Sequence, residues 1–400
     1  MTVRYMGTKR LLAPVVRSAF DGLEPRGPIV DLFSGMGSVA QALASCHPVV
    51  TNDLLSFTTT FSRCRFTSEK AGDGQALIRQ VNAPYQEQRD YLRRFYGRRL
   101  RLEATAVDEG RDSLQKWFDT APHVGNSRHY RDEARNAQRS EGGPEKHRLA
   151  VLYFATGYFS TDQAIQIDSL RYAIETTIVD PGELDWARAA WLSASSSVLN
   201  APGHTAQFLK PTTDQSFGRI KRTWRHNVWP YFVAALENLR PTGSLSWRRS
   251  NRVENQDALA LLKTLDKGDI AGVYADPPYT KDQYSRYYHV YETLYRYDFP
   301  DSVGKARARS DRFSTGFCLA TAVESSLEEL VESTARLDRP LVLSYPSDGL
   351  LASRGLEVSE VIERHRPVSN VISIPHRHST MGGSGGSKIK EIVEKIYVCS

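Results

Sequence analysis

The 400-residue sequence contains only four cysteines, and none of them forms a CxxC pair or stands at zinc-finger spacing from a histidine. This scarcity argues against a disulfide scaffold and a structural zinc site, so we expect no metal and a reducing, cytoplasmic location. No apolar run approaches the roughly 18–20 residues that a membrane span needs. The N-terminal apolar stretch is short and is broken by Arg17 before any cleavage site. We therefore expect no signal peptide and no membrane partner.

The composition is that of a folded globular chain, with 40% hydrophobic and 24% charged residues. This balance excludes collagen, coiled coil and wholesale disorder, and the length suffices for two or three domains. Lysine and arginine outnumber aspartate and glutamate by 52 to 46, which gives a net charge of +6 and a sequence pI near 9.0. Such a basic chain favours polyanionic partners.

Apolar strands alternate with glycine turns and helical patterns at both ends of the chain. Residues 27–60 give a strand, the turn SGMGS, a helix and a second strand that ends in an acid. Further apolar strands are predicted within 269–279 and 339–351. We therefore expect an α/β fold with a doubly wound, mostly parallel sheet. The terminal strands SNVISIPHRH and KEIVEKIYVCS flank a glycine loop, which predicts an antiparallel hairpin at one sheet edge.

The alternation stops between residues 61 and 250, where arginines cluster and segments such as QEQRDYLRRFYGRRL look helical and amphipathic. We interpret 61–250 as an inserted, largely helical domain. Residues 1–60 and 251–400 then form the domain that contains the sheet. The stretch 121–146 is polar and nearly devoid of aliphatic residues, so we expect a mobile loop there.

The tetrapeptide Asp276, Pro277, Pro278, Tyr279 is the most specific motif, because it directly follows an apolar strand. Open α/β sheets place their ligands at the carboxyl ends of parallel strands. The two prolines make the backbone rigid and leave its carbonyl groups free to accept hydrogen bonds. We expect Asp276 and the Pro277 carbonyl to accept from the exocyclic amine of a planar base, while Tyr279 stacks on the ring. The alternative is a strand-terminating turn with a solvent-exposed aspartate.

A glycine turn in DLFSGMGS at 31–38 is the second candidate site. Gly35 and Gly37 permit close approach of the backbone to a ligand, and Asp53 follows the next strand, where an acid would meet ribose hydroxyls. The third glycine of the dinucleotide fingerprint is lacking, so a nicotinamide dehydrogenase is the least favoured enzyme class. The alternative is a plain strand-to-helix turn.

Tyr5, Gly7 and Lys9, in the segment RYMGTKRLL, precede the first strand. Taken alone, this segment is an N-terminal helix cap with exposed basic residues. Its position just before the glycine turn favours a second interpretation, in which Lys9 reaches the carboxylate of an amino-acid-bearing ligand.

The window 201–250 contains eight cationic and two acidic residues, so its net charge of +6 equals that of the whole chain. Aromatic residues are interleaved with these charges, a mixture suited to phosphate contacts and to stacking or groove packing. We predict a nucleic-acid contact here, with five candidate cations: Lys210, Arg219, Lys221, Arg222 and Arg225. The alternative is a solvated basic face over an aromatic core.

Five tyrosines between residues 284 and 295 recur at helical spacing. Such a stripe on one helix face predicts a packed wall. His289 lies off this stripe, so we expect it to be either exposed near the site or a structural histidine.

In their order along the chain, these motifs resemble those of the Dam-like adenine-specific DNA methyltransferases. That family has a Tyr/Trp-x-Gly-x-Lys segment, an Asp-x-Phe-x-Gly-x-Gly turn, an inserted DNA-recognition region and then Asp-Pro-Pro-Tyr. The likeness continues through TKDQYSRYYHVYETL and the terminal HRHSTMGG, whereas the middle matches only loosely, through FGRIKRTWRHNVWPYF. The resemblance implies a class I methyltransferase fold with an inserted target-recognition domain.

The resemblance also implies roles for single residues, with S-adenosylmethionine as the cofactor. Asp53 would bind its ribose and Asp257 its adenine amine. The implied reaction is direct transfer of the methyl group to the exocyclic amine of adenine in duplex DNA, at Asp276, and no covalent intermediate is required. The methionine part of the cofactor would be held by Tyr5, Gly7, Lys9, Asp31, Phe33, Gly35 and Gly37.

Double-stranded DNA is the partner that the resemblance implies, in a restriction-modification or related system with a cognate restriction enzyme or other defence component. No Pro-Cys dipeptide occurs, which argues against cysteine-dependent methylation of a cytosine ring carbon. Two alternatives stay open. One is an amino-methyltransferase that acts on cytosine or on RNA, and the other is a catalytically silent DNA-binding protein with a methyltransferase fold.

Overall fold

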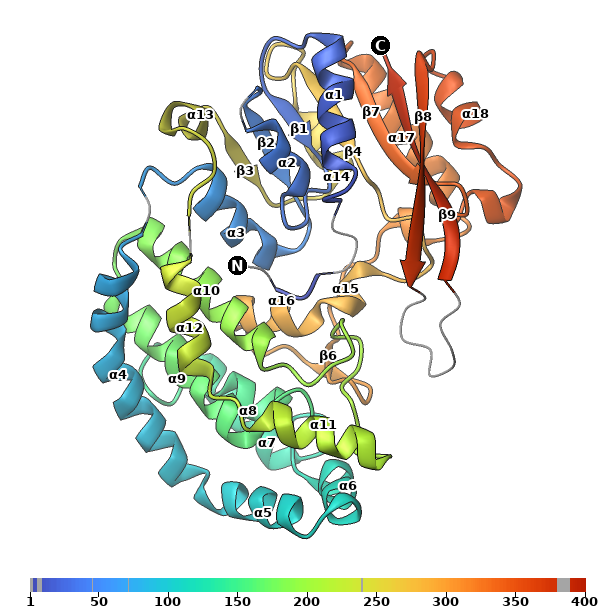
Figure 1. Cartoon of the computed structure of the whole chain (residues 1–400). Coiled ribbons are helices and arrows are strands. Elements are labelled where there is room, and N and C mark those ends of the chain that lie inside the picture. The colour runs from blue at the N-terminus through green and yellow to red at the C-terminus, as the bar shows by residue number, and fades with distance from the viewer. Residues whose placement is uncertain (1–2, 6–8, 45, 71, 239, 380–388) are drawn as a thin grey trace. The chain divides into compact units, whose positions relative to one another are not determined.

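The computed structural model describes residues 3–5, 9–44, 46–70, 72–238, 240–379 and 389–400. The chain divides into two compact units, each built from segments that are far apart in the sequence (Figure 1). We call the first the sheet unit, which comprises residues 7–70, 241–285 and 313–400. The second is the helical unit, which comprises residues 1–6, 71–240 and 286–312.

A seven-stranded sheet in the order β3-β2-β1-β4-β7-β9-β8 forms the centre of the sheet unit. The strands from β3 to β7 in this order run parallel, whereas β9 pairs antiparallel with both β7 and β8. The expected α/β fold with a mostly parallel sheet is thus confirmed. The strands are β1 (Ile29–Asp31), β2 (Val49–Asn52), β3 (Arg252–Glu254), β4 (Gly272–Ala275), β7 (Leu341–Pro346), β8 (Asn370–Ser379) and β9 (Ile389–Cys399).

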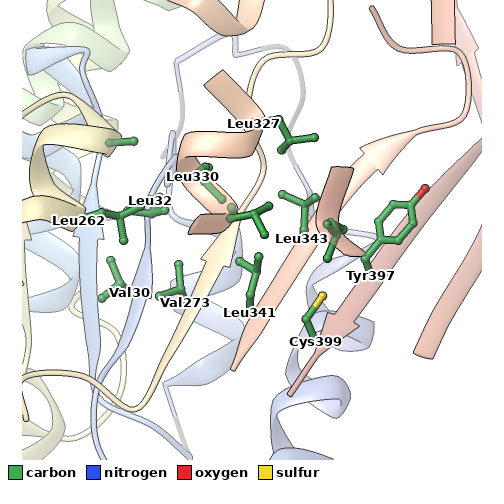
Figure 2. Close-up of a cluster of buried hydrophobic side chains, with 14 of the residues drawn as sticks. Val30, Leu32, Leu262, Val273, Leu327, Leu330, Leu341, Leu343, Tyr397 and Cys399 are labelled. Carbon is green, nitrogen blue, oxygen red and sulfur yellow. The ribbon is translucent and has the colours of Figure 1, made fainter. Parts of the chain in front are cut away.

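Helices cover both faces of this sheet, because its central strands are apolar on both sides and β1, β2, β4 and β7 are buried throughout. The core on one face joins the strands to α1 (Ala13–Leu23), α2 (Ser38–Leu43) and α13 (Leu245–Arg249). The core on the other face joins them to α14 (Ala258–Thr264), α17 (Val323–Arg336) and α18 (Val358–Glu363). Figure 2 shows this second core, where Leu341 and Leu343 of β7 lie close to Leu327 and Leu330 of α17.

The remaining elements of the sheet unit are short or lie at its margins. They are α3 (Ser56–Phe66), α15 (Tyr284–Tyr287), which crosses into the helical unit, and the 3-10 turns η1 (Gly316–Cys318) and η2 (Ala352–Arg354). All four cysteines are free thiols, and three of them are buried.

The helical unit packs around α9, a helix with buried residues on all sides. Ser160 begins this helix with a capping box, in which its side chain accepts from the Gln163 backbone and the Gln163 side chain accepts from the Ser160 backbone. No helix in the described part of the chain is both long enough and apolar enough to cross a membrane. The elements are α4 (Gly74–Phe95), α5 (Gly97–Asp108), α6 (Arg111–Thr120), α7 (Arg128–Arg139), α8 (Leu149–Phe154), α9 (Thr161–Thr177), α10 (Pro181–Ser197), α11 (Asp214–Trp224), α12 (Val228–Glu237), α16 (His289–Arg296), β5 (Ser302–Val303) and β6 (Ala308–Arg309).

The boundaries of the units differ from those expected from the sequence. Residues 61–70 and 241–250, expected in the insertion, belong to the sheet unit. Residues 286–312, expected with the sheet, belong to the helical unit. Most of the tyrosine-rich segment 284–295 therefore belongs to the helical unit. Its position shortly after Tyr279 in the sequence suggested the sheet unit instead.

Helix α7 lies within the stretch 121–146 that was expected to be a mobile loop, so that prediction is wrong for residues 128–139. Ser127 caps the helix by accepting a hydrogen bond from the Tyr130 N–H at 3.4 Å. Its buried residues are Tyr130, Ala134 and Ala137, which recur at helical spacing. The stripe is hard to detect in the sequence because it consists of one tyrosine and two small alanines, without a larger aliphatic side chain.

Candidate active site

Three carboxylates meet at the carboxyl ends of β1, β2 and β4. Asp31 is the last residue of β1, Asp53 directly follows β2, and Asp276 directly follows β4. The strands are in parallel register, with Asp31 opposite both Thr51 and Tyr274. The predicted glycine turn and the Asp276 tetrapeptide are therefore neighbours at the edge where open α/β sheets hold their ligands.

The glycine turn is fixed by Asp53. One carboxylate oxygen of Asp53 accepts from the Gly35 N–H at 2.8 Å, and the other accepts from the Leu55 N–H at 2.8 Å. Burial raises the pKa of Asp53 to about 6, although these N–H groups lower it. The backbone is left-handed at Gly35, with φ 49°, and at Gly37, with φ 70°, so both positions favour glycine. Asp53 thus shapes the turn in addition to any contact with a ligand.

Asp31 is buried beside this turn with one acceptor unused. Its side chain is almost wholly enclosed, and its Oδ1 has no hydrogen-bond partner among the described residues. Burial raises its pKa well above the usual range, and the nearby charges of Asp276 and Asp53 raise it further. Phe33 lies half-buried in the same segment, edge-on to Phe317. A buried acceptor without a donor fits a ligand that brings a donor of its own.

Asp276 forms an ion pair with Lys9, whose Nζ lies 3.0 Å from Asp276 Oδ1. The same ammonium donates to Glu394 Oε1 at 2.5 Å. Burial would lower the pKa of Lys9, but the two carboxylates outweigh burial and raise it. Burial raises the pKa of Asp276 to about 6, and Lys9 opposes this increase. Lys9, expected to reach a ligand carboxylate, lies instead between two carboxylates of the protein.

Glu394 is a site residue that the sequence analysis missed. It lies on β9, opposite Pro346 of β7 and Ile374 of β8, and it is buried. The sequence did contain a signal, because Glu394 lies on the same side of KEIVEKIYVCS as Ile396 and Val398. An acid is unusual on the buried side of a strand.

Tyr279 lies half-buried over the second core, edge-on to Tyr345 at 6.2 Å between ring centroids. The Lys9 ammonium lies 5.3 Å from the centre of the Tyr279 ring. The Tyr279 carbonyl accepts from the Leu350 N–H at 2.8 Å, which anchors the backbone after the prolines. Pro277 is buried and Pro278 is half-buried. The tetrapeptide is therefore held from several sides.

The other expected cofactor residues are spread more widely. Asp257 is exposed and caps α14, since its Oδ1 accepts from the N–H groups of Leu259 and Ala260 at 3.0 and 3.1 Å. Tyr5 belongs to the helical unit, where its ring stacks on Tyr288 with 4.4 Å between centroids. Gly7 lies outside the described residues. No group of three or more His, Cys, Asp or Glu side chains within the described ranges is arranged to hold a metal ion.

Helix α11 and its C-cap contain four of the five residues that were expected to contact a nucleic acid. Its buried residue is Ile220, and Arg219, Arg222 and the C-cap residue Arg225 are exposed. Because successive helical residues are about 100° apart, these three arginines lie within one third of the circumference, opposite Ile220. Lys221 lies half-buried over the Phe217 ring, and Lys210 pairs with Asp119 at 2.7 Å. The exposed arginines are thus the cations best placed to meet phosphates.

The aromatic residues of the same window pack inside the helical unit. Trp224 stacks on Phe118 at 5.4 Å between centroids, and Trp229 stacks on Tyr85 at 4.7 Å. Phe208 and Phe217 pack against the cluster that contains Ile220. These rings therefore help to build the helical unit, and their stacking on a nucleic acid stays a prediction.

Two further residues, one from the basic window and one from the tyrosine-rich segment, are buried. Arg248 belongs to the sheet unit and is buried, where it donates to the carbonyls of Ser68 and Gly243 at 2.6 and 2.7 Å. His289 is buried in the helical unit, with its Nε2 3.0 Å from the Tyr158 hydroxyl. Burial lowers the pKa of His289 to about 3. His289 is therefore the structural histidine of the two alternatives, not an exposed site residue.

Residues 211–340, which include α11 and the Asp276 tetrapeptide, match the family model of the D12 class N6 adenine-specific DNA methyltransferases. The chain is similar to the modification methylase LlaI of Lactococcus lactis subsp. lactis, with 24% identity over 82% of this chain. It is also similar to the type II methyltransferase M.FokI of Planomicrobium okeanokoites, with 26% identity over 52% of this chain. A third relative, the type II methyltransferase M.NlaIII of Neisseria lactamica, is 25% identical over 60% of this chain and 68% of its own.

The chain spans less than half the length of the first two of these relatives. The aligned region covers 44% of LlaI and 29% of M.FokI.

The glycine turn provides a test that needs no ligand. We predict that Gly37→Ala lowers the free energy of unfolding by about 2–4 kcal/mol, from left-handed backbone strain and overpacking. A Cβ at Gly37 would lie 2.4 Å from Phe66 Cε2. The matched control is Gly22→Ala in α1, where a Cβ would meet no atom within 4 Å. Urea unfolding should leave the control unchanged or more stable, and equal stability of both variants would contradict the strain argument.

Proposed function

This chain belongs to the Dam-like adenine-specific DNA methyltransferases, and from that premise we propose that it transfers a methyl group to the exocyclic amine of adenine in duplex DNA. The observation that carries the proposal is Asp276, a half-buried carboxylate at the carboxyl end of β4, paired with Lys9 and followed by two prolines. We further propose that the sheet unit is a class I methyltransferase domain with an antiparallel edge. The helical unit is then its target-recognition domain.

We propose that the glycine turn and its acids hold S-adenosylmethionine, which supplies the methyl group when bound. The unused Oδ1 of Asp31 is the observation that fits this group, because a buried acceptor can meet the cofactor's ammonium. Gly35 and Gly37 let the backbone approach the cofactor closely, and Asp53 fixes the turn by accepting a hydrogen bond from the Gly35 N–H. Phe33 and Asp257 complete the cofactor set on this proposal, and Asp257 has one oxygen left for it beyond its helix cap.

The residues of the tetrapeptide prepare the nucleophile. The lone pair of adenine's exocyclic nitrogen is delocalised into the ring, so the free amine is a weak nucleophile. Hydrogen bonds from this amine to Asp276 and to the Pro277 carbonyl favour the pyramidal state in which the lone pair is localised. The proline pair holds both acceptors still, and orientation against the methyl group lowers the barrier further. Tyr279 offers the flipped base an aromatic face.

Helix α11 is the part of the helical unit that we propose to contact DNA. Arg219, Arg222 and Arg225 project from one side of it, and the family match begins just before this helix. The role we propose is site-specific modification of DNA, with a cognate restriction enzyme as a further partner. The names of the matched modification methylases support this context.

The pH dependence of the reaction tests the role of Asp276. Its pKa is about 6, and only the ionised carboxylate accepts hydrogen bonds with both oxygens. We therefore predict that kcat at saturating cofactor rises with pH through about 6 and then levels. Asp276→Asn should lower kcat by about 100-fold or more, the loss typical of one preorganised hydrogen-bonding group. Cofactor binding should remain close to wild type.

Transfer of a labelled methyl group to duplex DNA measures both effects. The matched control is Asp266→Asn, an exposed aspartate of the same unit, which should keep wild-type kcat. A fully active Asp276→Asn enzyme would overturn the mechanism.

The DNA contact is tested through its salt dependence. Replacing Arg219, Arg222 and Arg225 with glutamine should reduce the slope of log K against log salt by about 2–3, since each phosphate contact contributes about 0.9. The same number of charges removed from α7, at Arg128, Arg135 and Arg139, controls for net charge. Fluorescence anisotropy with a labelled duplex gives the slopes. If both triple variants change the slope equally, α11 is only a solvated basic face.

Stacking by Tyr279 predicts a graded mutant series. Tyr279→Phe keeps the aromatic face and should retain most of kcat. Tyr279→Ala should lose about 10- to 100-fold, because stacking contributes about 1–3 kcal/mol per base. Single-turnover transfer to duplex DNA compares the two variants, and wild-type rates for Tyr279→Ala would reduce Tyr279 to a turn residue.

A further inference from the structure

Glu394 is a buried acid for which the proposed mechanism has no use. It lies in the middle of β9 between β7 and β8, and its side chain is 2% exposed. A buried carboxylate destabilises the fold unless it is paired and hydrogen-bonded. A hydrophobic residue at this position would stabilise the strand better, so we expect the acid to have a role within the site.

Lys9 is the partner of Glu394, and its position is set by both ends of the residue. Its carbonyl accepts from the N–H groups of Leu12 and Ala13, at 3.0 and 2.8 Å, where α1 begins. Its side chain is 12% exposed, and the ammonium donates to Glu394 at 2.5 Å. The side chain therefore spans from the start of α1 to β9.

The contact of Lys9 with Asp276 is of a different kind. The Nζ–Oδ1 distance is 3.0 Å, and Lys9 acts on Asp276 more through its charge than through a hydrogen bond, since Asp276 Oδ1 has no partner of good hydrogen-bond geometry among the described residues. Lys9 thus compensates the charge of Asp276 through space while it directs a hydrogen bond to Glu394. An acceptor that is charge-balanced yet unused is what a substrate amine requires.

We propose that Glu394 is a positioning residue that draws the Lys9 ammonium away from hydrogen-bonding Asp276, so that the Asp276 acceptor stays open for the target amine. This inference rests on the proposed function for its catalytic consequence. Its electrostatic part concerns Asp276, Lys9 and Glu394 alone and can be measured without substrate.

The charged and titratable groups around Asp276 determine the sign of the effect. Lys9 is the cation against it, Glu394 and Asp31 are the neighbouring acids, and Tyr274 and Tyr279 contribute phenols. Removing the charge of Glu394 ends one repulsion on Asp276 and frees Lys9 to move onto Asp276. Both changes favour the ionised carboxylate, so the pKa of Asp276 must fall.

The test compares wild type with Glu394→Gln by a carboxyl ¹³C titration of aspartate-labelled protein, with Asp276 assigned through Asp276→Asn. We expect the apparent pKa of Asp276 to drop by about one pH unit in Glu394→Gln, the size expected when one nearby charge is rearranged. The acid limb of kcat should move to lower pH by the same amount. The plateau of kcat should fall about tenfold, because Lys9 then occupies the acceptor, while the KM for cofactor stays near wild type.

A double-mutant cycle with Lys9→Met separates positioning from simple repulsion. Lys9→Met should raise the pKa of Asp276, and in that background Glu394→Gln should lower it by less than it does in wild type. Strictly additive pKa changes would show that Glu394 does not act through Lys9. The control Glu357→Gln removes an exposed acid that pairs with Lys395 of β9 and should leave the titration unchanged.

Two results would overturn the inference. One is an Asp276 titration in Glu394→Gln that coincides with wild type, even if thermal unfolding shows the variant to be less stable. The other is an increase in the pKa of Asp276.

If Glu394→Gln does not fold, Lys9→Met combined with Glu394→Met replaces the whole pair by apolar residues, a change that buried pairs often tolerate. The pKa of Asp276 must then rise above that of wild type. Wild-type protein without transferase activity would overturn the proposed function alone, because the titration needs no substrate.

Discussion

Parallel pairing of β1 with β4 is the interaction on which the candidate site depends. It joins segments more than 200 residues apart in the sequence and sets Asp31 opposite Tyr274. Because parallel strands end at the same edge, the glycine turn and the Asp276 tetrapeptide become neighbours without any direct link along the chain.

Charge balance is the second constraint on this edge. Asp31, Asp53, Asp276 and Glu394 are four acids in a small, largely buried region, and Lys9 is the cation that pairs with two of them. Burial raises the pKa of Asp53 and Asp276 to about 6. Among the described residues, these acids therefore outnumber the cation that pairs with them, which suits a ligand that brings positive charge and amine donors.

In the helical unit, basic and aromatic side chains of one helix serve different purposes according to which way they face. On α11, exposed Arg219 and Arg222 and the packed rings of Phe217 and Trp224 lie within the same eleven residues. The inner face builds the unit itself, and the exposed face is the one that we propose to contact a polyanion. Basic and aromatic residues in one segment thus need not act on the same ligand.

The sequence by itself determined the mostly parallel sheet and the positions of Asp53 and Asp276 after their strands, because strand period, glycine turns and Asp-Pro-Pro-Tyr are local signals. Edge strand β3, with three residues, and α7, with its alanine stripe, gave too weak a local signal to be predicted. Only the tertiary structure decided that Lys9 faces Asp276 and Glu394, that Asp53 fixes the glycine turn, and that Trp224 packs inward. These are contacts between distant segments, and the energy of burying a charge or a ring depends on partners that the local sequence does not contain.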